Sequence, residues 1–207
     1  MVKIVHGQYS PGRRARNKAA VRARLYDAAV AMFRSGGFDA TPVEAITERA
    51  DVSKGTFFNY FATKDHVLAE YHDRMTGRIL ERLEALSEHS AEAAVLAAME
   101  ACAEWVENDR EMGRIVVTRI FGSPVLLGAD LQNTRRFMDW LGAVVSAGVE
   151  SGELRRDLDV PVMLSMLAAV LSSTMNGWVL DPDAFDLREM LRRKTRFVFD
   201  AGRGGTA

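Results

Sequence analysis

The sequence predicts an all-α protein of about nine helices, with a three-helix N-terminal domain followed by a larger helical domain. Apolar residues recur three and four positions apart along most of the 207 residues, which is the spacing of one face of an α-helix. No segment alternates apolar and polar residues as a half-buried strand does. Glycine, proline and helix-capping residues separate the periodic segments. These observations favour helices packed on helices.

The first helix is predicted over residues 17–35. Its apolar stripe consists of Leu25, Ala28, Ala29, Met32 and Phe33. Gly36-Gly37 is expected to end it, because glycine readily adopts the left-handed conformation of a helix C-terminus. Residues 1–15 are predicted to form a flexible basic arm, since two glycines and a proline oppose a helix there.

Two short helices joined by a tight turn follow. Thr41 is expected to cap the first of them, with Pro42 at its first position and Glu44 completing a capping box. Ser53 is expected to cap the second, which covers residues 54–61. In a helix-turn-helix of this kind the second helix enters the major groove of DNA.

The second short helix carries groups that suit DNA. Its N-terminus and Lys54 favour a phosphate. Gly55 has no side chain, so the backbone can approach a base edge. Thr56, Asn59 and Tyr60 offer hydrogen-bonding groups. A helical hairpin packed only for stability is the alternative.

The charge distribution also favours DNA. No acidic residue precedes Asp27, whereas seven lysines and arginines do. Residues 1–65 contain eleven basic and six acidic residues, a net charge of +5, although the whole chain carries −1 and residues 66–207 therefore −6. Such asymmetry indicates a polyanionic partner, and double-stranded DNA is the obvious one.

Phe57 and Phe61 lie four positions apart and are expected to pack onto the first two helices. A fourth helix is predicted from Lys64 to about residue 87, with Thr63 as its cap. Lys64 would add a second phosphate site at the start of that helix.

Part of the chain matches a known motif. The matching residues are Leu25 to Phe33, Gly37-Phe38, Thr41, Ile46, Ala50, Val52-Ser53, Gly55-Thr56, Phe61 and Lys64-Asp65. With them, residues 20–70 resemble the TetR (tetracycline-repressor) family of bacterial transcriptional regulators. The resemblance implies a DNA-binding domain over residues 16–62. It implies operator contacts by Thr41, Ser53, Lys54, Gly55, Thr56, Asn59, Tyr60 and Lys64. The family often has a tyrosine where this chain has Phe58, which cannot donate to a phosphate.

Residues 63–201 are predicted to form a second domain, followed by a tail at 202–207. After the helix that starts at Lys64, helices are expected at 91–108, 110–121, 132–150, 161–179 and 185–201. By the same resemblance, this domain binds an effector and dimerises.

An unknown small-molecule effector is expected among the middle helices, because methionine and aromatic side chains suit an adaptable apolar pocket. The candidate lining residues are Met75, Met99, Cys102, Trp105, Met112, Val116, Ile120, Phe137, Met138 and Leu141. Each could equally be ordinary core. Arg114, Arg119 or Glu104 could supply a polar anchor, or each could be a solvated surface group.

The last two helices are apolar on more than one side, which indicates burial on several sides. The resemblance implies that they form a homodimer interface. The candidate interface residues are Met163, Met166, Leu167, Val170, Met175, Trp178, Leu191, Phe197 and Val198. The alternative is the core of a monomer. A dimer would read two half-sites about one turn of DNA apart, which predicts a palindromic operator.

Catalytic, metal and cofactor sites are not expected. The chain has no Walker loop, no G-x-S-x-G, no H-E-x-x-H and no histidine three residues after a glutamate. Glu70, His72 and Asp73 are clustered but are expected to be surface groups. Cys102 is the only cysteine and is expected to be a small buried apolar residue.

The N-terminus lacks the apolar core of a secretory signal, and the longest apolar segment is interrupted by polar residues. A cytoplasmic protein without a membrane partner is therefore expected. The predicted function is that of a ligand-responsive dimeric transcriptional regulator, a repressor released by a small apolar effector. One alternative is a ligand-binding or protein-interaction bundle that no longer binds DNA, and another is an activator.

Overall fold

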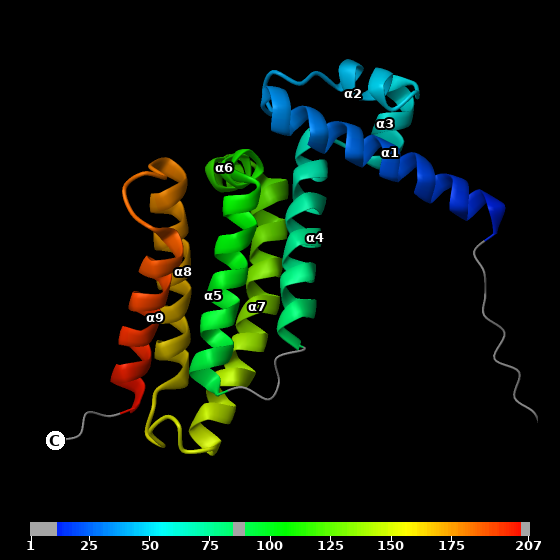
Figure 1. Cartoon of the computed structure of the whole chain (residues 1–207). Helices are drawn as coiled ribbons and strands as arrows, with labels where there is room; N and C mark the ends of the chain where they lie inside the picture. Colours follow the sequence, from blue (N-terminus) through cyan, green and yellow to red (C-terminus); the bar gives the residue numbers. More distant parts are fainter. Residues whose placement is uncertain (1–11, 85–89, 204–207) are drawn as a thin grey trace, which may run out of the picture. The chain divides into compact units, whose positions relative to one another are not determined.

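The computed structural model describes residues 12–84 and 90–203, and within them it contains nine α-helices, one 3-10 turn and no strand (Figure 1). The elements are α1 (Arg13–Gly36), α2 (Val43–Arg49), α3 (Lys54–Tyr60), α4 (Lys64–Glu84), α5 (Ala91–Asn108), α6 (Arg110–Arg119), η1 (Ile120–Gly122), α7 (Pro124–Glu150), α8 (Val160–Leu180) and α9 (Leu187–Arg203). The predicted all-α fold is confirmed. The chain divides into two compact units between Val67 and Leu68, within α4.

The first unit consists of α1, α2, α3 and the start of α4. Both α2 and α3 have only 7 residues, and helices this short are not stable alone in water. They are held by a core in which each side chain is 0–1% exposed, made of Leu25, Phe33, Ile46, Phe57 and Phe61. The prediction that Phe57 and Phe61 pack inward is confirmed.

α1 begins at Arg13, inside the segment that we expected to be a flexible arm. The carbonyl of Gly12 accepts the backbone N–H groups of Ala15 at 2.9 Å and Arg16 at 3.1 Å. Arginine and alanine are strong helix formers, so the helix extends back to the glycine. Residues 1–11 of the predicted arm lie outside the described residues.

The predicted capping box at the start of α2 is wrong. Pro42 is the N-cap of this helix, and no side chain caps it. The hydroxyl of Thr41 instead donates to the carbonyl oxygen of Gly37 at 2.7 Å, and Thr41 is only 3% exposed. Thr41 therefore stabilises the turn between α1 and α2, because its hydroxyl group binds the residue that follows α1.

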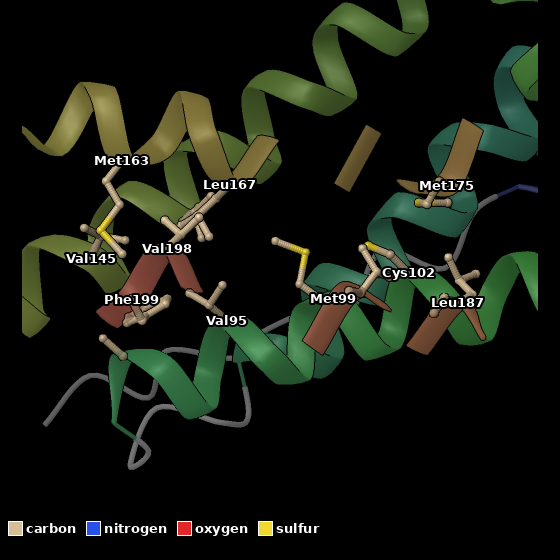
Figure 2. Packing of buried hydrophobic residues seen from close by; sticks show 14 of the residues in the cluster. Val95, Met99, Cys102, Val145, Met163, Leu167, Met175, Leu187, Val198 and Phe199 are labelled. Atoms are coloured by element: carbon tan, nitrogen blue, oxygen red, sulfur yellow. The ribbon is translucent and has the colours of Figure 1, made fainter. Parts of the chain in front are cut away.

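In the second unit, α5, α7, α8 and α9 run alongside one another, and α6 lies across one end (Figure 1). Figure 2 shows part of the core, where Val95, Val145, Leu167 and Phe199 from these four helices lie close together. An apolar face on each of four neighbouring helices buries a continuous core of this kind.

α7 begins at Pro124, eight residues before the predicted start. The hydroxyl of Ser123 accepts the N–H of Leu126 at 3.3 Å and caps the helix. The chain changes direction at Gly122-Ser123-Pro124, where the helical segments 110–122 and 124–150 meet at an angle of 108°. The predicted bounds of α3, α5, α6, α8 and α9 agree with the structure within two residues.

α8 has 21 residues and is long and apolar enough to cross a membrane by length and composition alone. Met163, Leu167 and Trp178 of α8 are buried in the second unit, and the core helix of a globular protein passes the same test. Val162, Met166 and Leu180 of α8 are exposed, and these apolar side chains need another explanation.

Candidate DNA-contacting helix and effector cavity

α3 begins with the side-chain cap that the sequence predicts. The Oγ atom of Ser53 accepts the N–H of Thr56 at 3.2 Å and lies 2.9 Å from the Thr56 hydroxyl. This cap fixes the first turn of a 7-residue helix. Ser53 therefore serves the helix as an acceptor, and its hydroxyl group still has a proton with which it can donate to a phosphate.

Lys54 lies on the exposed surface of α3. Its ammonium group forms an ion pair with the carboxylate of Glu44 in α2, and the two side chains are 56% and 62% exposed. Lys54 holds the pKa of Glu44 below its usual value, mainly through the hydrogen bond. Exposed ion pairs of this kind are weak, so a phosphate can replace Glu44 as the partner of Lys54.

The side chains of two predicted operator contacts are engaged inside the first unit. Thr41 is buried against the turn after α1, as described above. The ammonium group of Lys64 donates to the carbonyl oxygens of Phe38 and Thr41, each at 2.7 Å, and lies 4.5 Å from the centroid of the Phe38 ring. Lys64 thus fastens the start of α4 to the α1–α2 turn, which sequence position alone did not indicate.

The remaining predicted contacts lie along the outer side of α3. Gly55 and Asn59 are exposed, and Thr56 and Tyr60 are half-buried. A Cβ atom added to Gly55 would meet only the Oγ atom of Ser53, at 3.9 Å. This is ordinary contact, so no neighbour within the described chain requires glycine at this position. Phe58 is 48% exposed on the same helix.

The second unit contains a cavity of about 380 Å³, with walls from α4, α5, α6, η1, α7 and α8. This volume lies in the range of roughly 300–1,000 Å³ that is typical of small-molecule sites. Most of the side chains that line it are apolar. Seven lining residues were predicted from the sequence, namely Met75, Cys102, Trp105, Val116, Ile120, Phe137 and Met138.

Three other predicted lining residues do not reach the cavity. Met99, Met112 and Leu141 are 0–1% exposed and belong to the packed interior. Cys102 is buried, and burial raises the pKa of its thiol to about 12. The thiol is therefore uncharged at neutral pH, which confirms that this residue acts as an apolar side chain.

One wall of the cavity is polar, and the sequence did not indicate it. It contains His72 from α4 with Asp130 and Asn133 from α7. The Nδ1 atom of His72 lies 3.8 Å from an Oδ1 atom of Asp130. Burial lowers the pKa of His72 and raises that of Asp130. The His72 ring stacks on Trp105 with 6.1 Å between centroids and 17° between planes.

The expectation that three neighbouring residues of α4 are all surface groups is wrong for two of them. The side chains of Glu70 and His72 are each 13% exposed, whereas that of Asp73 is 62% exposed. Adjacent helical residues do point in different directions, but α4 is covered on more than one side. No group of three or more potential metal ligands occurs among the residues that the structure describes.

The polar anchors suggested by the sequence do not line the cavity. Arg114 pairs with Glu111, and Glu104 pairs with Arg82, all at partly exposed positions. Arg119 is also absent from the cavity wall. The polar wall described above comes instead from two residues of α7 and one of α4, and other polar residues of the lining are Thr76, Thr134, Ser172 and Asn176.

The residues predicted for a dimer interface fall into two groups. Six of them are at most 9% exposed within the second unit, namely Met163, Leu167, Met175, Trp178, Leu191 and Val198. Val170 is half-buried, and Met166 and Phe197 are 52% and 76% exposed. Val162 and Leu180 of α8 are also exposed. An apolar outer face therefore remains on α8 and α9.

Two family models match the chain. The model for bacterial regulatory proteins of the tetR family matches residues 25–71, and the model described as YsiA-like protein, C-terminal region, matches residues 71–201.

Curated relatives of known function are regulators. The fatty acid metabolism regulator protein of Bacillus subtilis is 23% identical over 167 residues, which cover 79% of this chain and 86% of the relative. The transcriptional repressor KstR2 of Mycobacterium tuberculosis is 27% identical over 161 residues, which cover 69% of this chain and 73% of the relative. KstR of Mycolicibacterium smegmatis is 39% identical, but over only 70 residues, 34% of this chain and 32% of that protein.

Solved structures share the fold. FadR of Thermus thermophilus in complex with lauroyl-CoA gives a TM-score of 0.75 at 25% identity and covers 90% of this chain and 98% of its own. FadR of Bacillus subtilis in complex with stearoyl-CoA gives a TM-score of 0.73 at 20% identity and covers 86% of this chain and 97% of its own.

A helix-turn-helix unit followed by a helical unit with its own cavity defines the class of ligand-responsive transcriptional regulators. The family models cover most of the chain, and the protein belongs to the TetR family of bacterial regulators. The resemblance inferred from residues 20–70 is confirmed.

Proposed function

We propose that this protein is a cytoplasmic homodimeric repressor that binds a palindromic operator through α3 and leaves it when an acyl-CoA binds the second unit. The observation that carries the proposal is the largely apolar cavity of about 380 Å³. Two proteins of the same fold have been crystallised with lauroyl-CoA and stearoyl-CoA.

The DNA contacts would come from the outer side of α3. Lys54 and Asn59 are exposed there, and Gly55 leaves the backbone accessible. The net charge of +5 in residues 1–65 adds attraction that does not depend on base sequence. Two copies of α3 about 34 Å apart would read successive major grooves on one face of the duplex.

The acyl chain would occupy the cavity. Its wall contains Ile79, Val116, Phe137 and Met138, and burying each methylene group contributes about 0.8 kcal/mol. No lysine or arginine lines the cavity among the described residues. The phosphates of coenzyme A would therefore stay outside, because buried anions without a cation are strongly disfavoured.

The homodimer would form through the outer face of α8 and α9. Val162 and Met166 are about half exposed on α8, and Leu180 and Phe197 are each 76% exposed. Several large apolar side chains left exposed on two neighbouring helices favour a protein interface. It also explains why α8 is more apolar than the core of one chain requires.

The two functions would be coupled through α4. Met75, Thr76 and Ile79 of this helix line the cavity, and Lys64 at its start is bonded to the α1–α2 turn. A ligand that shifts α4 would change the position of α3. To change the ratio of released to DNA-binding conformation from 1:99 to 99:1, the ligand must bind the released conformation more favourably by about 5.5 kcal/mol.

The test is selection of bound duplexes from a random pool by the full chain, followed by addition of lauroyl-CoA to the selected complex. We expect a palindrome bound by a dimer and dissociation by lauroyl-CoA. If folded protein enriches no sequence at low salt, the repressor assignment fails and a helical binding module without DNA activity is favoured. If a palindrome is enriched but no acyl-CoA releases it, only the effector class fails.

A further inference from the structure

The polar wall of the cavity is assembled by two helices. Asp130 and Asn133 lie three residues apart on α7 and therefore on one face. His72 approaches Asp130 from α4. In the described residues, the wall contains this carboxylate and no lysine or arginine. Its electrostatic character therefore differs from that of an anion-binding site, which needs a cation or several N–H donors.

The amide of Asn133 has a defined orientation. Asn133 is only 3% exposed, and its Oδ1 atom accepts a hydrogen bond from Nη1 of Arg136 at 3.4 Å. The same nitrogen of Arg136 donates to Asp73 at 2.8 Å, which fixes the guanidinium. If the side-chain amide of Asn133 were flipped, its N–H groups would point at the positively charged guanidinium group of Arg136. The oxygen of Asn133 therefore faces Arg136, and its nitrogen faces away.

The Nδ2 atom of Asn133 is buried and donates to no acceptor in the described part of the chain. The Nδ1 atom of His72 is also buried without such a partner, because 3.8 Å to Asp130 is too long for a hydrogen bond. Buried polar atoms in proteins are nearly always hydrogen-bonded. Two such atoms in one cavity wall therefore indicate the place where a bound molecule supplies the missing partner.

We propose that Asn133, assisted by His72, recognises an uncharged oxygen acceptor of the effector, a carbonyl or a hydroxyl, and that this wall rejects a carboxylate. This inference deepens the proposed function and rests on the assignment of the cavity as the effector site. An acceptor oxygen would satisfy the Nδ2 donor. The thioester carbonyl of an acyl-CoA has this property, and so does a ketone or an alcohol.

Rejection of a carboxylate follows from the same wall. A fatty acid anion would enter beside Asp130, and no cation of the wall would offset its charge. Burying an uncompensated anion is far more costly than burying a neutral carbonyl group. The cavity therefore discriminates a thioester from the free acid of the same chain length.

Isothermal titration of the full chain with two matched pairs of probes tests this. Lauroyl-CoA and S-dodecyl-CoA differ by the thioester carbonyl oxygen, and 2-decanone and nonanoate have the same alkyl chain and differ by the charged oxygen that replaces a methyl group. We expect wild-type protein to bind the first member of each pair about tenfold or more tightly. Asn133→Leu removes the donor, and Asn133→Asp keeps the shape but replaces the donor by an acceptor. Both variants should lose the preference for lauroyl-CoA.

Gln132→Leu is the matched control, because it removes an exposed amide one residue away that does not line the cavity. It should retain both preferences. Thermal unfolding of each variant checks that it is folded.

The outcomes separate the inference from the proposed function. If wild-type protein binds lauroyl-CoA and S-dodecyl-CoA equally, recognition by Asn133 is overturned and the acyl-CoA class stands. If 2-decanone binds through Asn133 while neither CoA compound binds, the acyl-CoA assignment fails and the recognition stands. If no probe binds, both are overturned.

Discussion

Replacement of Gly55 by alanine should stabilise the protein and weaken its binding to DNA. The added Cβ atom would lie 3.9 Å from Ser53 Oγ and meet no other atom within 4 Å, and Gly55 is not among the residues with a positive φ. Alanine is favoured over glycine in a helix by up to about 1 kcal/mol. That gain corresponds to a Tm increase of about 2–4 °C for a protein of this size.

On the operator, the same methyl group would separate the α3 backbone from the duplex. Loss of one hydrogen bond to a charged phosphate costs about 1.5–3 kcal/mol, which corresponds to a Kd that is roughly 10- to 100-fold higher. Calorimetry would measure the Tm, and fluorescence anisotropy with the selected duplex would measure the Kd at fixed salt.

Gly128→Ala is the matched control. Gly128 is an exposed residue of α7, and a Cβ atom there would meet nothing within 4 Å. This variant should gain stability and retain wild-type DNA affinity. If Gly55→Ala binds the operator as tightly as wild type does, the backbone of α3 does not approach DNA at this residue. If it instead loses stability, the account of free space around Gly55 is wrong.

Three further predictions concern charge, pH and packing. Lys54→Ala should reduce the slope of log Kobs against log salt by about 0.9 for each half-site, and an unchanged slope in salt titrations would exclude a phosphate contact by this residue. Burial lowers the pKa of His72 in the folded protein, whereas the ordinary value is 6.5. The unfolded chain therefore takes up the proton first, and stability should fall as the pH drops below about 6.5. His72→Gln should flatten this dependence in thermal scans between about pH 5 and pH 8, and parallel curves for the two proteins would contradict it. Gly148→Ala would place a Cβ atom 2.7 Å from that of Ala91, so urea unfolding should reveal a loss of about 1–3 kcal/mol. A gain in stability would mean that α5 and α7 do not pack this closely.

The fold could be predicted because helical periodicity and caps are local properties. Ser53 lies next to the helix that it caps, and the spacing of Phe57 and Phe61 places both on one side of α3. The roles of Thr41 and Lys64 could not be predicted in the same way. Their partners are carbonyl groups up to 26 residues away, and only the folded turn between α1 and α2 brings them within reach.

The lining of the cavity could be predicted only in part, because it brings together residues that are distant in sequence. Residue type indicated methionines and aromatic side chains, but it could not distinguish Met75 in the wall from Met99 in the packed core. The polar wall gave no signal, because His72 and Asp130 are 58 residues apart in sequence and meet only where α4 lies against α7. Similarly, composition alone could not separate the exposed Met166 from the buried Met163.

We expect occupancy of the cavity and binding of α3 to DNA to exclude one another. Thermodynamic linkage requires that the factor by which lauroyl-CoA weakens operator binding equals the factor by which operator weakens lauroyl-CoA binding. The most direct measurement is the Kd of lauroyl-CoA for the full chain, with and without saturating selected duplex. We expect the duplex to raise this Kd at least tenfold. An identical Kd in both titrations would mean that the two sites are not coupled.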